Sequence, residues 1–278
     1  MNIQTKAGLK KEMLAYFRTN RFTAIAASLV GLAILSPLLI VGLSTVMTAM
    51  SDIYDEVGID VTMMTDMLGS NSSIGVSEAV GNITTIGLLI FILLISRYAG
   101  GEQKKRADII PRSAGLRSFG YIFPKFIVYP ISAFITGFIA MMAAWFISGL
   151  LFENNDVAIN VAVIVSMLVG VCLMLYICLH LALGTATGQA GMSAVVCIVA
   201  SLLLPTAFMA VGVELVYNPF AMGGLARFVS LGGADAPEMQ EIVMTVIIAF
   251  VIMMISYFIA IFAQNARVID NRGNEISL

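Results

Sequence analysis

The sequence predicts an all-α integral membrane protein with six transmembrane helices. Three observations lead to this fold class. Hydrophobic residues make up 59% of the chain and charged residues only 12%, whereas soluble domains carry about 25% charged residues. The chain contains uncharged runs long enough for six helices that cross the hydrocarbon. Its lysines and arginines are confined almost entirely to alternate segments between those runs. The charge is too sparse to cover the surface of a soluble fold.

The uncharged runs place the spans at about 22–50, 79–97, 124–151, 158–183, 193–214 and 242–264. A helix needs about 20 apolar residues to cross the bilayer. The run 157–213 is long enough for two spans, and its glycine-rich stretch 184–193 supplies the turn between them. Residues 22–278 therefore form one transmembrane domain, which follows a separate segment 1–21.

The basic residues predict that both ends of the chain lie in the cytoplasm. Five precede the first span, seven lie between the second and third spans, and Arg267 and Arg272 follow the sixth. Six spans place all of these on one side and leave only Arg227 on the other, and loops rich in Lys and Arg stay in the cytoplasm. The first outer loop, 51–78, holds six carboxylates and no base. These carboxylates either keep the loop solvated or recruit a cationic substrate or ion.

The segment 1–21 has the spacing of an amphipathic helix. One face carries Leu9, Met13, Tyr16 and Phe17, and the opposite face carries basic residues. Such a helix lies along the inner leaflet with its bases near anionic head groups. A simple basic flank that only orients the first span is the alternative. The candidate residues of the interfacial helix are Lys10, Lys11, Tyr16, Phe17 and Arg18.

The segment 97–125, between the second and third spans, surrounds an apolar Ile109-Ile110-Pro111 core with basic residues. This pattern predicts a short cytoplasmic helix that ends at Pro111. The helix offers a docking surface for a soluble partner, although a solvated loop that only retains positive charge in the cytoplasm is an open alternative. The candidate contact residues are Glu102, Lys104, Lys105, Arg106, Ile109, Ile110, Pro111 and Arg112.

The segment 214–241 lies on the outer side before the sixth span. Its apolar part, 220–231, is flanked by turn residues and predicts a short helix half inserted into the outer leaflet, or else an ordinary amphiphilic loop. Glu214 ends the fifth span, where it is either hydrated or part of an exit gate. The candidate gate residues are Glu214, Tyr217, Asn218, Pro219 and Phe220.

No sequence motif indicates catalysis. The chain has no phosphate-binding loop, no nucleophile elbow and no zinc-binding helix motif. His180 is its only histidine and is expected to be a buried, hydrogen-bonded structural residue, and its three cysteines lie in apolar stretches as packing residues. We therefore expect a non-catalytic membrane protein without a metal, a cofactor of its own or a nucleic-acid partner. The lack of charge in the middle of the spans also disfavours an ion-coupled carrier.

The arrangement resembles the permease subunit of type-2 ABC exporters. In that family the loop after the second span runs from a Glu through an apolar pair and Pro to a Lys at the next span. Here Glu102, Ile109-Ile110, Pro111, Arg112 and Lys125 occur in that order. Tyr217-Asn218-Pro219-Phe220 is similar to the Asn-Pro turn that leads into the family's extracellular re-entrant helices.

The resemblance implies half of an ATP-driven exporter in a cell membrane, most simply a bacterial plasma membrane. Residues 102–117 would be the coupling helix that contacts a separate ATP-binding subunit, which would bind ATP and Mg and carry out the hydrolysis. A second permease chain would complete the pathway, for an amphipathic or lipophilic substrate such as a peptide, drug or lipid. The alternatives are a membrane anchor or sensor that recruits a soluble partner, and an ion-coupled carrier.

Overall fold

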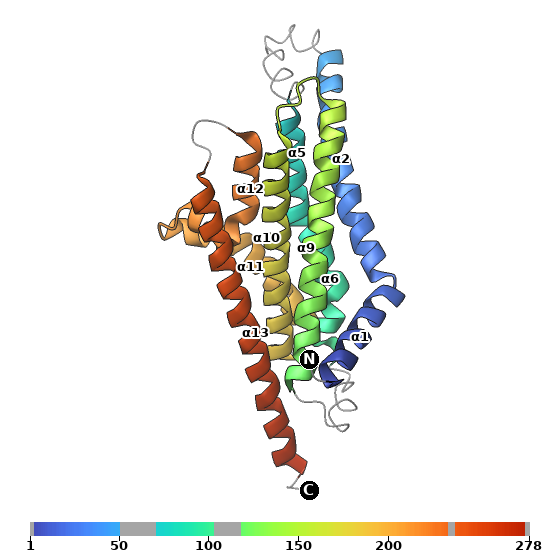
Figure 1. Ribbon diagram of the computed structural model, residues 1–278, viewed down its shortest axis with the longest axis vertical. Coiled ribbons are helices and arrows are strands. Elements are labelled where there is room, and N and C mark those ends of the chain that lie inside the picture. The colour runs from blue at the N-terminus through green and yellow to red at the C-terminus, as the bar shows by residue number, and fades with distance from the viewer. Residues whose placement is uncertain (1–2, 51–70, 103–117, 233–236, 276–278) are drawn as a thin grey trace.

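The computed structural model describes residues 3–50, 71–102, 118–232 and 237–275, with the side chains of residues 5–266 inside those ranges. These parts of the chain are helical and contain no strand. The helices form an elongated bundle, and α1 and the C-terminal end of α13 lie at the same end of it (Figure 1). We call this the lower end, as Figure 1 shows it, and the opposite end the upper end.

Within the described ranges six helices are long and apolar enough to cross a membrane, which confirms the predicted all-helical, six-span composition. They are α2 (Arg21–Ala49), the continuous helix Ser72–Gly101, α9 (Ser118–Leu151), α10 (Ile159–Thr187), α11 (Ala190–Ala210) and the first part of α13 (Met239–Glu275). Four shorter helices accompany them: α1 (Ile3–Arg18), η3 (Leu215–Tyr217), η4 (Pro219–Ala221) and α12 (Met222–Leu231).

The second span is a single helix with two π-helical turns. It consists of α5 (Ser72–Asn82), the π-helical turn η1 (Ile83–Gly87), α6 (Leu88–Ser96) and the π-helical turn η2 (Arg97–Gly101). It begins before residue 79, where the uncharged run starts, because the loop between α9 and α10 caps it. Asp156 accepts hydrogen bonds from the Ser73 amide at 2.8 Å and from the Ser72 hydroxyl at 2.9 Å, so it satisfies one of the backbone donors that a helix start leaves open.

α10 is the central helix of the bundle and contacts α9, α11, α12 and α13. In its most apolar stretch 72% of the residues are buried, against 17% in α11 and 22% in α13. Glycines allow α9 and α10 to approach closely, because a Cβ atom on Gly137 would lie 3.4 Å from the Cα atom of Gly170. The peripheral helices α11 and α13 instead leave long apolar faces uncovered.

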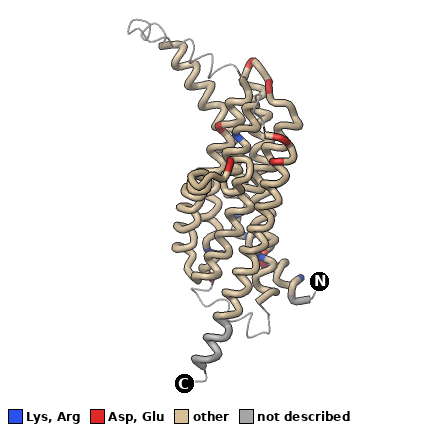
Figure 2. Tube along the Cα trace, turned by 90° about the vertical axis from the view of Figure 1, so that its left-hand side faces the viewer, with Lys and Arg blue, Asp and Glu red and all other residues tan. Residues whose placement is uncertain are grey.

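Charged residues separate along the bundle. Figure 2 shows most of the described acidic residues toward the upper end. Arg227 of α12 is the one basic residue described there, and it pairs with Glu78 of α5 at 3.2 Å. The lower end has both signs, including α1 with its lysines and the buried groups that form the candidate site.

Candidate functional site at the lower end of the bundle

α1 packs along one face against the start of α9. Thr5, Glu12 and Tyr16 are buried on this face, and a Cβ atom on Gly8 would lie 2.9 Å from the carbonyl oxygen of Gly120. These positions recur at helical spacing, so they form one continuous strip. α1 is therefore docked on the bundle through a close backbone approach at Gly8 and through polar side chains.

The residues of the predicted apolar face of α1 do not share one environment once α1 packs on α9. Tyr16 is fully buried against the bundle, whereas Met13 and Phe17 are 45% and 48% exposed on another side of the helix. The expectation that they share one membrane-facing surface is wrong for Tyr16, because residues 12 and 16 stack on the strip that contacts α9. The predicted interfacial residues Lys10 and Arg18 are exposed, and Lys11 is half exposed at the edge of the contact.

Glu12 is the buried charge that α1 brings to the site. One of its oxygens accepts a 2.7 Å hydrogen bond from the Tyr129 hydroxyl of α9, and the other lies 3.3 Å from Lys11 Nζ. Tyr16 accepts a hydrogen bond from Ser132 at 3.1 Å, and burial raises the pKa of Tyr16 to about 12, so its hydroxyl stays neutral. The strip that docks α1 thus combines a paired carboxylate with neutral hydroxyl groups.

Lys125 of α9 has all three of its ammonium N–H groups satisfied. Its Nζ lies 2.7 Å from Glu102 Oε2, 2.8 Å from the Tyr98 carbonyl oxygen and 3.1 Å from the Tyr121 hydroxyl oxygen. Tyr121 in turn donates to Glu102 at 2.8 Å. A buried ammonium group in an apolar helix such as α9 is stable only with such partners.

Glu102 joins this cluster to α1. Burial alone would raise the pKa of Glu102, but the charge and hydrogen bond of Lys125, with the nearby Lys11 and the Tyr121 hydroxyl, hold the pKa below its ordinary value. Lys11 Nζ lies 3.7 Å from Glu102 and also pairs with Glu12. The two carboxylates and two ammonium groups therefore form one balanced charge network, made of Lys11, Glu12, Glu102 and Lys125.

Aromatic rings extend the network to α2. The Tyr98 ring stacks on Tyr129 at a centroid distance of 4.9 Å, and the Arg21 guanidinium lies 5.1 Å from the centroid of Tyr98. Arg21 also donates to the carbonyl oxygen of Leu94, and its charge over an aromatic face is a favourable contact. The network thus connects α1, the start of α2, the end of the second span and α9.

The charge network lies at the end of the described range 71–102. Glu102 directly follows the π-helical turn η2 and directly precedes residues 103–117. The other predicted contact residues lie outside the described residues: Lys104, Lys105, Arg106, Ile109, Ile110, Pro111 and Arg112. Of that predicted set, the structure brings Glu102 alone into the network.

η2 also lies against the turn between α10 and α11. A Cβ atom on Gly184 would be 2.6 Å from the Cβ atom of Ala99, and one on Gly100 would be 2.7 Å from the Gly184 carbonyl oxygen. Gly188 ends α10 with a φ of +68°, so the glycine-rich stretch does form the predicted turn. Gly31 of α2, in contrast to Gly184, has open space around its Cβ position.

The predicted gate residues fall into two groups. Asn218, Pro219 and Phe220 are buried, and Asn218 donates from Nδ2 to the Pro205 carbonyl oxygen at 2.9 Å while its Oδ1 accepts from the Phe220 amide at 3.1 Å. Glu214 and Tyr217 are exposed on the turn that precedes them. The turn places α12 against α5 and α10, and the Tyr176 hydroxyl of α10 secures it by donating to the Phe220 carbonyl oxygen at 3.0 Å.

Sequence reasoning missed Glu12, Tyr121 and Tyr129. One signal could have found Glu12, since it is the only carboxylate among the bases of the first segment and lies one helical turn before Tyr16. Lys125 in an otherwise apolar run also demands a carboxylate partner. The identity of that partner depends on how α1 docks, and the local sequence does not contain this information.

Other chemistry is sparse in the described ranges. They contain no group of three His, Cys, Asp or Glu residues that could hold a metal ion. His180 is fully buried, as expected. The three cysteines are buried and unpaired, as packing residues are.

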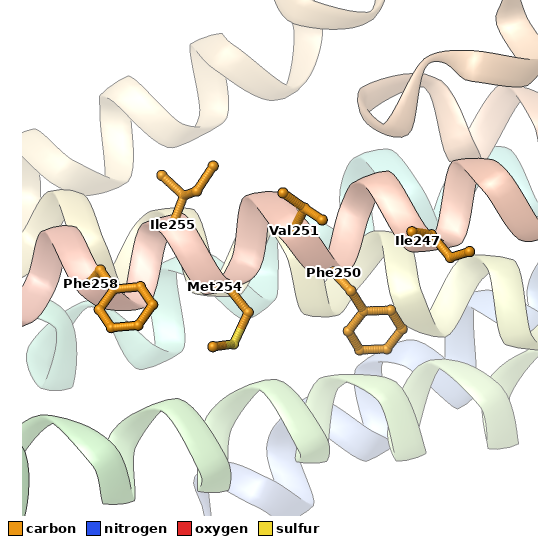
Figure 3. Close-up of a pocket in the computed structure, with 6 residues that line it drawn as sticks. All are labelled: Ile247, Phe250, Val251, Met254, Ile255 and Phe258. Atoms are coloured by element: carbon orange, nitrogen blue, oxygen red, sulfur yellow. The ribbon is translucent and has the colours of Figure 1, made fainter.

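An apolar groove runs along the exposed side of α13 (Figure 3). Its volume is about 360 Å³, and it is lined by Ile247, Phe250, Val251, Met254, Ile255 and Phe258. These side chains recur at intervals of three and four residues, so they share one face of the helix. The groove offers contacts to hydrocarbon and has no charged group in its lining.

No protein-family model matches the chain, and no curated protein matches it. The functional conclusion therefore depends on the architecture and on the charge network.

Proposed function

We propose that this chain is the transmembrane permease subunit of an ATP-driven ABC exporter in a cell membrane. Two such chains, identical or paralogous, form the pathway, and each binds a separate ATP-binding subunit that holds ATP and Mg. The chain itself is not the catalyst. Both of its ends face the cytoplasm, which makes the lower end of the bundle the cytoplasmic end.

The charge network is the observation that carries this proposal. Glu102 is the first residue of the segment 102–117, which we propose as the coupling helix. Its side chain forms an ion pair with Lys125 of α9 and lies next to Lys11 of α1. A partner that displaces the segment therefore pulls on a buried carboxylate whose release is unfavourable. Movement of the segment would move α9 and α1 together. Binding of the ATP-binding subunit outside the membrane can therefore shift the spans between two arrangements.

Two further features support an exporter architecture. α12 and the buried Asn218 turn form a short element packed into the upper end, in the position expected of re-entrant helices before the sixth span. The groove on α13 is lined by apolar side chains, which favours an amphipathic or lipophilic substrate over an ion. A peptide, drug or lipid fits this chemistry.

The first test is co-purification of the chain with a candidate ATP-binding subunit, followed by transport measurements in proteoliposomes. We expect ATP-dependent substrate movement. Reversing the charges at Lys104, Lys105 and Arg106 should separate ATP hydrolysis from transport without unfolding the spans. Wild-type transport by that variant would contradict the coupling assignment, and transport driven by an ion gradient without any ATP-binding subunit would replace the proposal by a carrier.

A subtler variant tests the network itself. Glu102→Gln keeps the shape of the side chain but removes the charge beside Lys125, so the movement of substrate per ATP hydrolysed should fall while the ATP-binding subunit still binds. Glu153→Gln, on the exposed loop between α9 and α10, removes an equal charge at the other end of the bundle and serves as the control. If the two variants move equal amounts of substrate per ATP hydrolysed, the charge network has no part in coupling.

A further inference from the structure

The π-helical turn η2 is held by a side chain from another helix. Its closing backbone hydrogen bond runs from the Glu102 amide to the carbonyl oxygen of Arg97, five residues back. In an α-helix the Glu102 amide would donate to the carbonyl of Tyr98, four residues back. The Tyr98 carbonyl oxygen instead accepts a 2.8 Å hydrogen bond from Lys125 Nζ of α9. Lys125 therefore occupies the acceptor that the α-helical form of η2 would use.

Lys125 also binds the side chain of the residue that closes the turn. Its Nζ lies 2.7 Å from Glu102 Oε2, so one ammonium group fixes both the backbone and the carboxylate of Glu102. Arg21 of α2 adds a second contact from another helix, because it donates to the Leu94 carbonyl oxygen, one turn before Tyr98. π-Helical turns are rare and often mark functional sites. η2 keeps this form because α2 and α9 bind its carbonyl groups and those just before it.

The other π-helical turn of the second span, η1, is stabilised in a different way. The hydroxyls of its own Thr84 and Thr85 donate to carbonyl oxygens four residues earlier, at 2.7 and 2.6 Å. These side chains belong to the same helix and move with it, whereas Lys125 belongs to α9. η2 is thus the turn whose form depends on the position of a neighbouring helix.

We propose that Lys125 holds η2 as a π-helical turn and that withdrawal of Lys125 converts η2 to α-helix. A π-helical turn contains one more residue than the α-helical turn that it replaces. The conversion therefore turns the chain after η2 by about 100° and moves it by about 1.5 Å, the increments of one α-helical residue. Gly100 and Gly101 lie where the backbone changes and have no side chains to obstruct it.

The conversion separates Glu102 from Lys125 and turns the segment 102–117 with it. The proposal thus deepens the function proposed above, because it supplies the movement by which the coupling helix and α9 influence each other. Only the transport measurement below rests on that function. The tests of folding and of labelling need no ATP-binding subunit, so the two proposals can fail separately.

Deletion of Gly101 tests the extra residue in the full chain. The Glu102 amide then lies four residues after Arg97, so the same bond becomes α-helical and Glu102 stays beside Lys125. The matched control deletes Leu93 from the α-helical part α6, which turns Glu102 by about 100° away from its partners. Purified in detergent, the Gly101 deletion should keep most of its folded yield and the Leu93 deletion should lose most of it. Similar losses in the two chains would overturn the proposal.

The role of Lys125 is measured by the accessibility of position 102. Glu102→Cys is introduced into a chain whose three native cysteines are replaced by alanine, and labelling by a water-soluble maleimide is followed. Adding Lys125→Met should raise the labelling rate several-fold, because position 102, where the Glu102 side chain is 17% exposed, turns out of its site. In the chain that lacks Gly101 the same substitution should leave the rate nearly unchanged, because no extra residue remains. Equal increases in both chains, or no increase in either, would overturn the proposal.

Transport links the conversion to the proposed function. With the ATP-binding subunit in proteoliposomes, the chain that lacks Gly101 should move several-fold less substrate per ATP hydrolysed than the unmodified chain, because its coupling segment can no longer turn. Normal transport by the shortened chain would overturn the conversion as a step of transport. Absence of transport by the unmodified chain, with folding and labelling as expected, would count against the exporter proposal alone.

Discussion

Replacing Lys125 by methionine is the sharpest perturbation of the charge network. Methionine has a similar volume, so the main change is the loss of a charge that satisfies Glu102, the Tyr98 carbonyl and the Tyr121 hydroxyl at 2.7–3.1 Å. Breaking a buried ion pair from one side costs about 3–5 kcal/mol, because the remaining charge is left uncompensated. Glu102 keeps Lys11 at 3.7 Å and a side-chain exposure of 17%, so we expect the lower value, about 3 kcal/mol.

The double variant Lys125→Met/Glu102→Gln separates the ion pair from packing. It leaves no uncompensated charge at this position, so it should be more stable than Lys125→Met alone, with a coupling energy of about 2 kcal/mol. The assay is unfolding in mixed micelles by added denaturing detergent, followed by far-ultraviolet circular dichroism and Trp145 emission. Lys10→Met, at an exposed position of α1, is the control and should change stability by less than about 0.5 kcal/mol. If Lys125→Met behaves like this control, or if the two single losses simply add, the ion pair does not stabilise the fold as argued.

Three further predictions use the same unfolding assay. Gly184→Ala should lower the free energy of unfolding by about 1–3 kcal/mol, because the added Cβ atom would lie 2.6 Å from Ala99. Gly31→Ala is the control and should be neutral or slightly stabilising, because the space around Gly31 is open. Equal effects of the two substitutions would contradict the close contact at Gly184. Asp156→Ala should cost about 1 kcal/mol through loss of the cap on α5, and Glu153→Ala on the same loop should cost less than half of that; similar losses would show that the cap is unimportant. The pKa of Glu102 is lowered on folding, so its stabilisation should be complete above its ordinary pKa of 4.5 and disappear as pH falls through the lowered value; an advantage over Glu102→Gln that stays constant across this range would refute the assignment.

The spans could be predicted from the sequence because hydrocarbon imposes a simple condition on every residue of a crossing helix. Uncharged runs of sufficient length satisfy it, and the six described helices correspond to those runs. Helix ends obey a different condition, because partners far away in sequence decide them. α5 begins at Ser72 since Asp156, more than 80 residues later, accepts from its first turn. No local pattern around residue 72 contains that contact.

The candidate site was predictable only in part for a similar reason. Glu102 was singled out through the family resemblance as a contact for a partner, which stays a prediction, whereas its pairing with Lys125 was not foreseen. Tyr16 was assigned to the membrane-facing side of α1, yet it faces α9, because docking of a helix can use either edge of a broad apolar face. The hydrogen bond between Glu12 and Tyr129 joins residues 117 positions apart. The two residues come together only when α1 packs on α9.

The central position of α10 has a practical consequence for following motion in this protein. In the described ranges α9, α11, α12, α13 and the second span all pack against α10. α10 also reaches the turn beside η2 at one end and supports the Asn218 turn through Tyr176 nearer its middle. Any rearrangement of the peripheral helices must therefore take place around a shared axis that cannot tilt far without disturbing all of them at once. A spectroscopic probe attached near an end of α10 should serve as the fixed reference point, and distances from it to α1, α11 and α13 should change during the transport cycle that we propose.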